Sequence, residues 1–387
     1  MAEESKKCAL DEGKGGDIKD KKKSSVSNKI KELEDRISKT KYNKKTQFAI
    51  GTYKAQLAML KEKQIAHASV GKKSQSYSIK KSGNATVAIL GFPSVGKSTL
   101  LNALTNANSR VGSYDFTTLD VVPGVLEYRN AKIQILDVPG IVRGAAAGTG
   151  RGKEVLAAIR NADLIIMMID VNQPKHYGYL MKEVYDSGIR LNTRSPDVKI
   201  VKTERNGVSI SSTVKMTKLN HETIKSMLKE FRLSNAYVVI REDITDDQLI
   251  DILEGNRVYM PSVLVINKID LASPEKIEEI KREFRPDIMI SANRKIDTEP
   301  LKEIIFRKLR IINVFLKEVG READMKEPLI MREGCTIEDV CVRLHKDFLE
   351  KFRFARVWGK SVKFPGQKVL KVSHKLMDGD ILEMHLA

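Results

Sequence analysis

The chain has 387 residues, a formal net charge of +18, 41% hydrophobic and 30% charged residues, and 3 cysteines. This is the composition of a globular protein, and the length allows two or three domains with a sizeable core. There is no run of 18 apolar residues and no apolar segment at the N-terminus, so we expect neither a membrane span nor a secretory signal. Cys8, Cys335 and Cys341 are too few and too scattered for a disulfide framework or a zinc site, which suits a reducing cytoplasm.

The positive charge is concentrated near the two ends of the chain. Residues 1–80 hold 20 Lys and Arg against 10 Asp and Glu, and residues 343–375 hold 10 against 2. Basic segments on both sides of a near-neutral centre favour a polyanionic partner, with RNA as the first candidate. Two well-solvated basic appendages explain the same charges equally well.

The N-terminal part is expected to be a tail followed by helices. Residues 1–25 are rich in Lys, Asp, Gly and Ser, which predicts a disordered basic tail. Apolar residues then recur at helical spacing and predict a helical hairpin over residues 26–70. Two such helices bury little surface alone, so we expect them to dock on a neighbouring domain or on a partner. The apolar positions are Ile30, Leu33, Ile37, Ile50, Tyr53, Leu57 and Leu60.

A phosphate-binding loop follows the first buried strand. Residues 91–99 read G-F-P-S-V-G-K-S-T, which matches G-x-x-x-x-G-K-[ST]. The apolar run 85–90 before it and the helical sequence 100–104 after it supply the strand–loop–helix context that the motif requires. Backbone N–H groups of the loop and the helix N-terminus can point at phosphates. The predicted nucleotide-binding residues here are Gly91, Pro93, Ser94, Val95, Gly96, Lys97, Ser98 and Thr99.

A later motif predicts that the base is guanine. Asn267-Lys268-Ile269-Asp270 follows an apolar strand, and the Asp270 carboxylate can accept hydrogen bonds from guanine N1–H and the exocyclic amine. Adenine lacks these donors and would leave the carboxylate unpaired, which disfavours an ATP-using kinase. We expect Asn267 and Lys268 to brace the loop and cover the base. Ser291-Ala292-Asn293, after another apolar strand, is expected to supply a backbone N–H to the guanine carbonyl.

Two loops are expected to sense the γ-phosphate. Asp137 and Gly140 form D-x-x-G, in which Asp137 holds Mg²⁺ through a water and the Gly140 N–H meets the γ-phosphate. One hydroxyl of Thr117 or Thr118 should reach Mg²⁺, and Thr118 is preferred because it directly precedes the apolar Leu119. Loss of the γ-phosphate would release both loops, as in a GTPase switch. The predicted metal ligands are Ser98, Thr118 and Asp137, and the predicted catalytic residues are Lys97, Thr118 and Gly140.

Ile141 predicts slow hydrolysis. A Gln directly after D-x-x-G orients the attacking water in Ras-like proteins, and isoleucine cannot do so. We therefore expect help from a monovalent ion, a partner or another residue, which is worth about 10³–10⁵ in rate in other GTPases. Arg143 and Arg151, in a glycine-rich loop that is a switch candidate, either contribute or are solvated loop charges.

The rest of the chain predicts an insertion and a small C-terminal domain. Residues 172–235 interrupt the GTPase pattern with an α/β element, in which Asn206-Gly207 is expected to turn a hairpin over residues 198–211. The GTPase domain is predicted at 84–171 and 236–320, with a closing helix from Leu301 to about Val314. Short strands and turns over 326–387 predict a small α+β domain.

On these motifs the chain resembles the developmentally regulated GTP-binding proteins, the DRG family of the Obg-like GTPases. The resemblance implies a P-loop GTPase core with a three-layer, mostly parallel sheet, an N-terminal helical hairpin, an inserted S5D2-like α/β element and a C-terminal α+β TGS (ubiquitin-like) domain. The residues that carry it are 91–99, 116–119, 137–141, 148–152, 357–363, 367–369 and His374.

The resemblance also implies partners and ions. Family members are cytoplasmic, associate with ribosomes like translation factors, and are stabilised by a zinc-finger regulatory protein. Relatives with a hydrophobic residue at the position of Ile141 often depend on potassium, which is usually tied to an Asn in the phosphate loop, where this chain has Ser94. Arg143 stands where family members usually have an acidic residue.

The C-terminal domain is a candidate RNA contact. Trp358 or Phe354 could stack a base, although core packing is the alternative for Trp358. The sequence thus favours a GTP-binding protein that hydrolyses GTP slowly as a ribosome- or RNA-associated switch in translation. The alternatives are an RNA-associated scaffold with a structural nucleotide, and a GTPase acting on a non-ribosomal protein complex. The expected phosphate contacts are Lys351, Arg353, Arg356, Lys360, Lys363, Lys368 and Lys371.

Overall fold

The computed structural model describes residues 26–43, 45–69, 83–105, 122–138 and 159–387. These residues form two compact units. Of the described residues, those up to 69 and Arg194–Arg257 form the smaller unit, and those from 83 to Thr193 together with Val258–Ala387 form the larger unit. The phosphate loop and the C-terminal domain belong to the larger unit.

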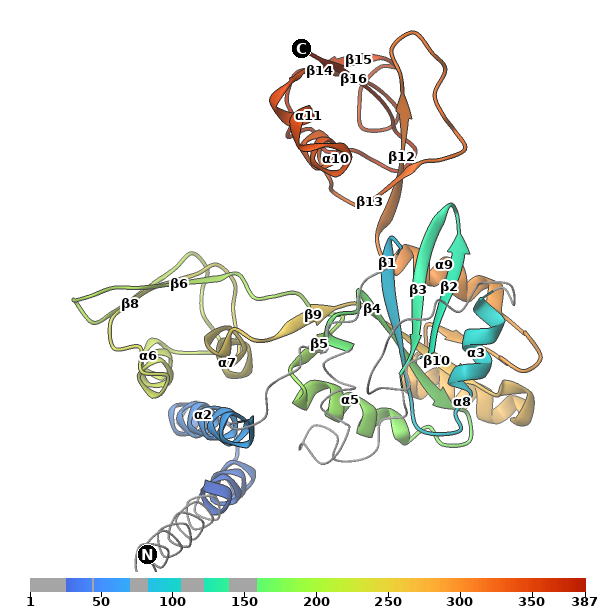
Figure 1. Cartoon of the computed structure of the whole chain (residues 1–387). Helices are drawn as coiled ribbons and strands as arrows, with labels where there is room; N and C mark the ends of the chain where they lie inside the picture. The colour runs from blue at the N-terminus through green and yellow to red at the C-terminus, as the bar shows by residue number, and fades with distance from the viewer. Residues whose placement is uncertain (1–25, 44, 70–82, 106–121, 139–158) are drawn as a thin grey trace, which may run out of the picture. The chain divides into compact units, whose positions relative to one another are not determined.

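A six-stranded sheet forms the centre of the larger unit (Figure 1). Its order is β11-β10-β4-β1-β3-β2, and every neighbouring pair is parallel except β2 and β3. The strand order reverses between β1 and β4, which is where open α/β sheets leave a crevice for ligands. The strands are β1 (Ala85–Leu90), β2 (Val122–Tyr128), β3 (Ala131–Asp137), β4 (Leu164–Asp170), β10 (Ser262–Asn267) and β11 (Ile288–Met289).

Helices cover both faces of this sheet. Val87 and Ile89 of β1 pack with α3 (Lys97–Leu104) and α9 (Thr298–Lys308) on one face. Ala88 and Leu90 pack on the other face, with the core that α5 and α8 complete. Strands that are buried on both faces consist of consecutive apolar residues, which explains the apolar run 85–90 before the phosphate loop. This arrangement confirms the predicted three-layer α/β core. The second pair of helices is α5 (His176–Asp186) and α8 (Pro274–Phe284).

The chain passes from the larger unit to the smaller unit and back again next to two paired strands of the larger unit. β5 (Ile189–Leu191) pairs in parallel with β9 (Val258–Met260), on either side of the segment that belongs to the smaller unit. Asn192 fastens this point, because its Oδ1 accepts from the Ser262 N–H at 2.8 Å and its Nδ2 donates to Ser262 Oγ at 2.9 Å.

The smaller unit contains a three-stranded sheet that corrects the hairpin prediction. Its order is β6-β8-β7, so β8 (Ala236–Ile240) lies between β6 (Val198–Lys202) and β7 (Val208–Ser212), and those two strands do not pair. Asn206 and Gly207 do have the positive φ of a tight turn, 79° and 69°.

The connection between β6 and β7 is stabilised by hydrogen bonds to Asn235, the residue directly before β8. Asn235 Oδ1 accepts from the Gly207 N–H at 2.8 Å, and Asn235 Nδ2 donates to the Glu204 carbonyl at 3.2 Å. The insert also extends past residue 235, where we had expected it to end. β8 and α7 (Asp246–Glu254) share an apolar core with α6 (His221–Glu230), and the GTPase fold resumes only at Val258.

The N-terminal helices belong to the same unit as this insert. Residues 26–39 are helical, and α2 (Gln47–Ser69) packs against α6 and α7 (Figure 1). Ala55 of α2 is fully buried in the insert core. A Cβ atom on Gly51 would lie 2.7 Å from Thr223 Cγ2, so glycine is what allows α2 and α6 to approach so closely.

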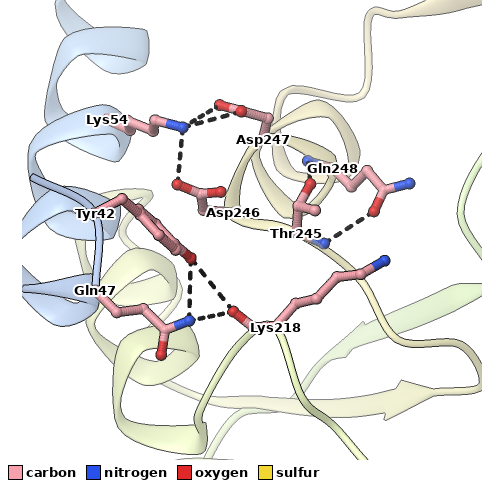
Figure 2. A network of polar contacts seen from close by, with 8 residues as sticks. All are labelled: Tyr42, Gln47, Lys54, Lys218, Thr245, Asp246, Asp247 and Gln248. Atoms are coloured by element: carbon pink, nitrogen blue, oxygen red, sulfur yellow. Dashed lines mark hydrogen bonds and ion pairs between the residues drawn. The ribbon is translucent and has the colours of Figure 1, made fainter. Parts of the chain in front are cut away.

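A polar network fastens α2 to the insert (Figure 2). Lys54 Nζ lies 2.9 Å from a carboxylate oxygen of Asp246 and 2.9 Å from one of Asp247. Burial lowers the pKa of Lys54, but the two carboxylates outweigh it and hold the pKa above its ordinary value. Gln47 Nε2 donates to the carbonyl of Lys218. The helical hairpin therefore docks, through α2, on the insert.

The C-terminal part forms a second sheet, of five strands in the order β13-β12-β16-β14-β15. Here the expected closing helix was too long. α9 ends at Lys308, Arg310 has a φ of 51°, and the β-branched run that follows forms strand β12 of this sheet. The domain thus begins before residue 326. Its elements are β12 (Ile311–Lys317), β13 (Leu329–Arg332), α10 (Ile337–Leu344), α11 (Lys346–Glu350), β14 (Phe352–Trp358), β15 (Gln367–Val369) and β16 (Ile381–Leu386).

Candidate nucleotide-binding site

A pocket of about 520 Å³ lies where the parallel strands of the larger unit end. Its volume is within the usual range for small-molecule and cofactor sites. The phosphate-loop residues and the base-recognition residues, which are far apart in the sequence, line it together. The lining residues are Ser94, Gly96, Lys97, Ser98, Thr99, Asn267, Lys268, Asp270, Leu271, Ser291 and Asn293.

The phosphate loop has the backbone that its glycines suggest. Gly96 has a φ of 98°, and a Cβ atom there would lie 2.6 Å from Asn267 Nδ2. A Cβ atom on Gly91 would lie 2.7 Å from the Met168 carbonyl oxygen. Ser94 also has a positive φ, of 61°. Loops of this kind form concave anion-binding sites from their backbone N–H groups, and α3 begins directly after the loop.

Lys97 is a buried cation at the floor of this loop. Only 9% of the residue is exposed, and its Nζ donates to the carbonyls of Gly91 at 3.3 Å and Phe92 at 3.1 Å. Burial lowers the pKa of Lys97, and the negative charge of Asp137 opposes this effect. A phosphate group would supply the anionic partner that a buried ammonium requires.

Ser98 and Asp137 are brought together from α3 and β3. Ser98 Oγ donates to Asp137 Oδ2 at 2.5 Å, and only 8% of Asp137 is exposed. A hydroxyl and a carboxylate beside a phosphate site are the ligands that Mg²⁺ uses, so the chemistry of this pair fits the ion. No group of three or more His, Cys, Asp or Glu that could hold a metal lies within the described residues.

Several predicted residues lie outside the described part of the chain. They are Thr117, Thr118, Gly140, Ile141, Arg143 and Arg151. The two phosphate-sensing loops are therefore predictions from the sequence alone.

Asn267 braces the pocket from its buried position at the end of β10. Its Nδ2 donates to the Val95 carbonyl and its Oδ1 accepts from the Ala292 N–H, both at 2.9 Å. Only 2% of Asn267 is exposed. The Ala292 N–H therefore has a protein partner in this structure, and the expected backbone contact of this segment with guanine stays a prediction. Among the described predicted residues, Gly91, Pro93, Val95, Asp137 and Ala292 do not line the pocket.

Lys268 contacts the phosphate loop directly and is also held by Asp170, which was not among the residues predicted from the sequence. Its Nζ donates to the Ser94 carbonyl at 2.7 Å and lies 2.8 Å from Asp170 Oδ2. Asp170 ends β4 next to β10, where its partner across the strands is Asn267. An acidic residue at the carboxyl end of a buried parallel strand was the signal that could have identified it.

Asp270 is an ionised acceptor at the base end of the pocket. A hydrogen bond from the Ser291 side chain, with a smaller contribution from the charge of Arg294, holds the pKa of Asp270 below its ordinary value. Arg294 Nε lies 3.3 Å from Asp270 Oδ2. An ionised carboxylate only accepts hydrogen bonds, which suits two N–H donors of guanine and not adenine.

The C-terminal domain presents its predicted phosphate contacts to solvent, since all seven of the basic residues are exposed. Arg356 and Lys368 are opposite one another on β14 and β15. The aromatic candidates already have partners. Phe354 stacks on His385 with ring centroids 4.2 Å apart, and Lys317 Nζ lies 4.8 Å from the ring centroid of the half-buried Trp358.

Three family models match consecutive parts of the chain. A model described as 50S ribosome-binding GTPase matches residues 86–205, and one for the C-terminal region of that domain matches residues 205–311. A TGS domain model matches residues 312–385, which agrees with β12 as the first strand of that domain. No helix within the described residues is both long and apolar enough to cross a membrane.

Similar proteins cover nearly the whole chain. A GTP-binding protein of Methanocaldococcus jannaschii, named as uncharacterized, is 54% identical over 361 residues, 92% of each chain. Human developmentally-regulated GTP-binding protein 2 is 39% identical over 362 residues, 93% of this chain and 99% of the relative. The solved YchF GTPase of Schizosaccharomyces pombe aligns with 79% of this chain and 99% of its own at 15% identity, with a TM-score of 0.41. The chain belongs to the developmentally regulated GTP-binding proteins, with a P-loop GTPase domain and a C-terminal TGS domain.

Proposed function

We propose that this chain hydrolyses GTP slowly and acts as a ribosome- or RNA-associated switch in translation. The observation that carries the nucleotide part is the shared pocket. There the buried Lys97 of the phosphate loop and the ionised Asp270 of the base-recognition segment line one cavity of about 520 Å³. One end suits phosphates and the other suits guanine.

The roles of the residues follow from this arrangement. Lys97 would bind the β- and γ-phosphates, and Ser98 and Asp137, which share a hydrogen bond in this structure, would hold Mg²⁺. Mg²⁺ supplies positive charge against the phosphate oxygens. Thr118 and Gly140, from the two predicted sensing loops, complete the contacts that exist only with GTP. The difference between the GTP and GDP states would then be the ordering of those loops.

Slow hydrolysis follows from Ile141, which has no polar group to orient a water. A monovalent cation near the phosphates is one source of the help that hydrolysis then needs, so potassium is a candidate ion here. Ser94 offers a hydroxyl where relatives use an Asn, and its carbonyl is already bound by Lys268. We expect turnover by the purified chain to be slow in NaCl and faster in KCl. Fast turnover in both salts would contradict this proposal.

The ribosomal part is supported by charge and by the matching family model. The model for residues 86–205 is described as a ribosome-binding GTPase, and the basic residues of the TGS domain are exposed. Binding through such residues should weaken steeply with salt, because condensed cations are released from RNA. A cytoplasmic location and stabilisation by a zinc-finger regulatory protein are part of the same proposal.

The test is co-sedimentation with ribosomes at physiological potassium, with a non-hydrolysable GTP analogue compared with GDP. We expect enrichment with the analogue, and no difference between the two nucleotides for a Lys97→Ala control. Equal binding of the natural chain in both states would favour an RNA-associated scaffold. Binding that survives nuclease treatment, or no binding at all, would favour a non-ribosomal protein complex.

A further inference from the structure

The smaller unit contains a groove that the nucleotide site does not use. It has a volume of about 390 Å³ and is lined by residues of the N-terminal helix 26–39, of α2 and of the end of α6. Leu33, Met59 and Leu60 line it, and all three side chains are half-buried. The groove therefore has an apolar component that the helical hairpin and the insert do not cover themselves.

The acidic residues of the groove already have partners. Glu32 forms an ion pair with Arg36 at 2.6 Å, one turn along the same helix. Glu230 accepts a hydrogen bond from Gln56 Nε2 at 3.1 Å. Arg36 neutralises Glu32, whereas the neutral Gln56 leaves the charge of Glu230 in place, so four cations line the groove against two carboxylates.

Three cations on the groove have no ion-pair partner of this kind. Lys29, Lys63 and Arg232 line it, and in the part of the chain that the structure describes none of them is paired with an acidic side chain. Arg232 has a φ of 59° just after the end of α6, a position where Gly or Asn is usual. A long cationic side chain at that position adds charge to the groove where a glycine would leave none.

We propose that this groove binds an acidic amphipathic helix of a partner protein. Leucine and methionine side chains suit aliphatic anchors at helical spacing, and the three unpaired cations, with the net positive charge of the lining, suit carboxylates beside those anchors. RNA fits less well. None of the described residues that line the groove is aromatic, so it lacks the stacking surface on which proteins hold single-stranded bases.

The test uses the full chain and a designed probe. The probe is a fluorescent 18-residue helical peptide with Leu at i, i+3, i+4 and i+7 spacing and Glu at most other positions. Fluorescence anisotropy should give saturable binding that a scrambled peptide of the same composition does not show. The variant Lys29→Glu/Lys63→Glu/Arg232→Glu should weaken binding at least tenfold, because each attractive charge becomes repulsive.

A matched variant separates the groove from net charge. Lys31→Glu/Lys41→Glu/Lys225→Glu makes the same charge change at exposed positions that do not line the groove, and it should change affinity less than about threefold. Unchanged GDP binding and thermal unfolding would show that both variants are folded.

Three results would overturn the proposal. The first is equal binding of the probe by the natural chain and the groove variant, and the second is no saturable binding below about 1 mM. The third is binding of poly(U), and not of the peptide, that the groove variant loses. That result would assign the groove to RNA.

Discussion

Substitution of Asn267 by alanine tests the central contact of the nucleotide site. The change removes both 2.9 Å hydrogen bonds that join the phosphate loop to the base-recognition segment. It leaves the Val95 carbonyl and the Ala292 N–H without their partner, and these two residues are only 4% and 3% exposed. An unsatisfied buried backbone group costs about 1–3 kcal/mol.

The expected loss follows from these two groups. Water from the adjacent pocket can reach the vacated space, so we take the lower half of this range, about 1–2 kcal/mol for each group. The cost for the two groups together is then about 2–4 kcal/mol. If nucleotide binding must restore the braced arrangement, the affinity for GDP should fall about 30- to 1000-fold. Titration with a fluorescent GDP analogue in the presence of Mg²⁺ measures this directly. Amide hydrogen exchange at Ala292 should also become faster.

Asn256→Ala is the matched control. It removes the same side chain from an exposed position that does not line the pocket, and it should change GDP affinity less than about threefold. A loss of less than about fivefold for Asn267→Ala, in a chain that remains folded, would refute the idea that this side chain organises the site. So would unchanged exchange at Ala292.

Three further predictions concern charge. Asp270 must be ionised to accept hydrogen bonds from guanine, so the affinity for GDP should stay constant above the lowered pKa of Asp270 and fall as the pH drops through that pKa. Ser291→Ala removes the main hydrogen bond that stabilises the ionised form, so the affinity for GDP should begin to fall at a higher pH. Because burial lowers the pKa of Lys97, affinity should decline on the alkaline side below the ordinary lysine value of 10.5, and Lys97→Met should bind weakly with no such decline. Lys54→Met leaves the buried Asp246 without its cation and should lower the free energy of unfolding in urea by about 1–3 kcal/mol. The pKa of Lys54 is raised, so its contribution should be complete below pH 10.5 and be lost only above it.

Each of these has a clear contrary outcome. If the affinity of Ser291→Ala for GDP falls at the same pH as that of the natural chain, the hydrogen bond from Ser291 is not the cause of the lowered pKa of Asp270. A GDP affinity that is constant up to pH 10.5 would show that Lys97 does not titrate as a buried lysine. If Lys54→Met unfolds at the same urea concentration as the natural chain, the ion pairs do not fasten α2.

Local sequence predicted the backbone of the phosphate loop because its geometry is encoded within a few residues. Gly96 must adopt a positive φ, and the loop between β1 and α3 cannot be built otherwise. The partner of Asn206-Gly207 could not be found in this way. Both residues adopt turn conformations, but β8, which comes later in the chain, separates the two strands. Such pairing depends on packing with α6, which is not local.

Asp170 shows a different limit of the sequence. An acidic residue at the end of a strand has several ordinary explanations, such as solvation or helix capping. Its contact with Lys268 becomes apparent only when β4 and β10 are adjacent. The start of the TGS domain was misplaced for a related reason. An apolar run such as that of β12 can be a helix or a strand until its neighbours are known.

The pairing of β5 with β9 has a consequence for how this architecture can change. The two ends of the segment 194–257 start from strands that are hydrogen-bonded to each other, from Ile189 opposite Val258 to Leu191 opposite Met260. A three-residue strand spans only about 10 Å, but the two strands are parallel, so a linker that replaced the segment would need a crossover of roughly a dozen residues, still at little entropic cost. We therefore expect that the inserted segment 194–257 can be lengthened, replaced or removed with little effect on the central sheet of the GTPase domain. New binding surfaces could be acquired at this point while the nucleotide chemistry stays the same.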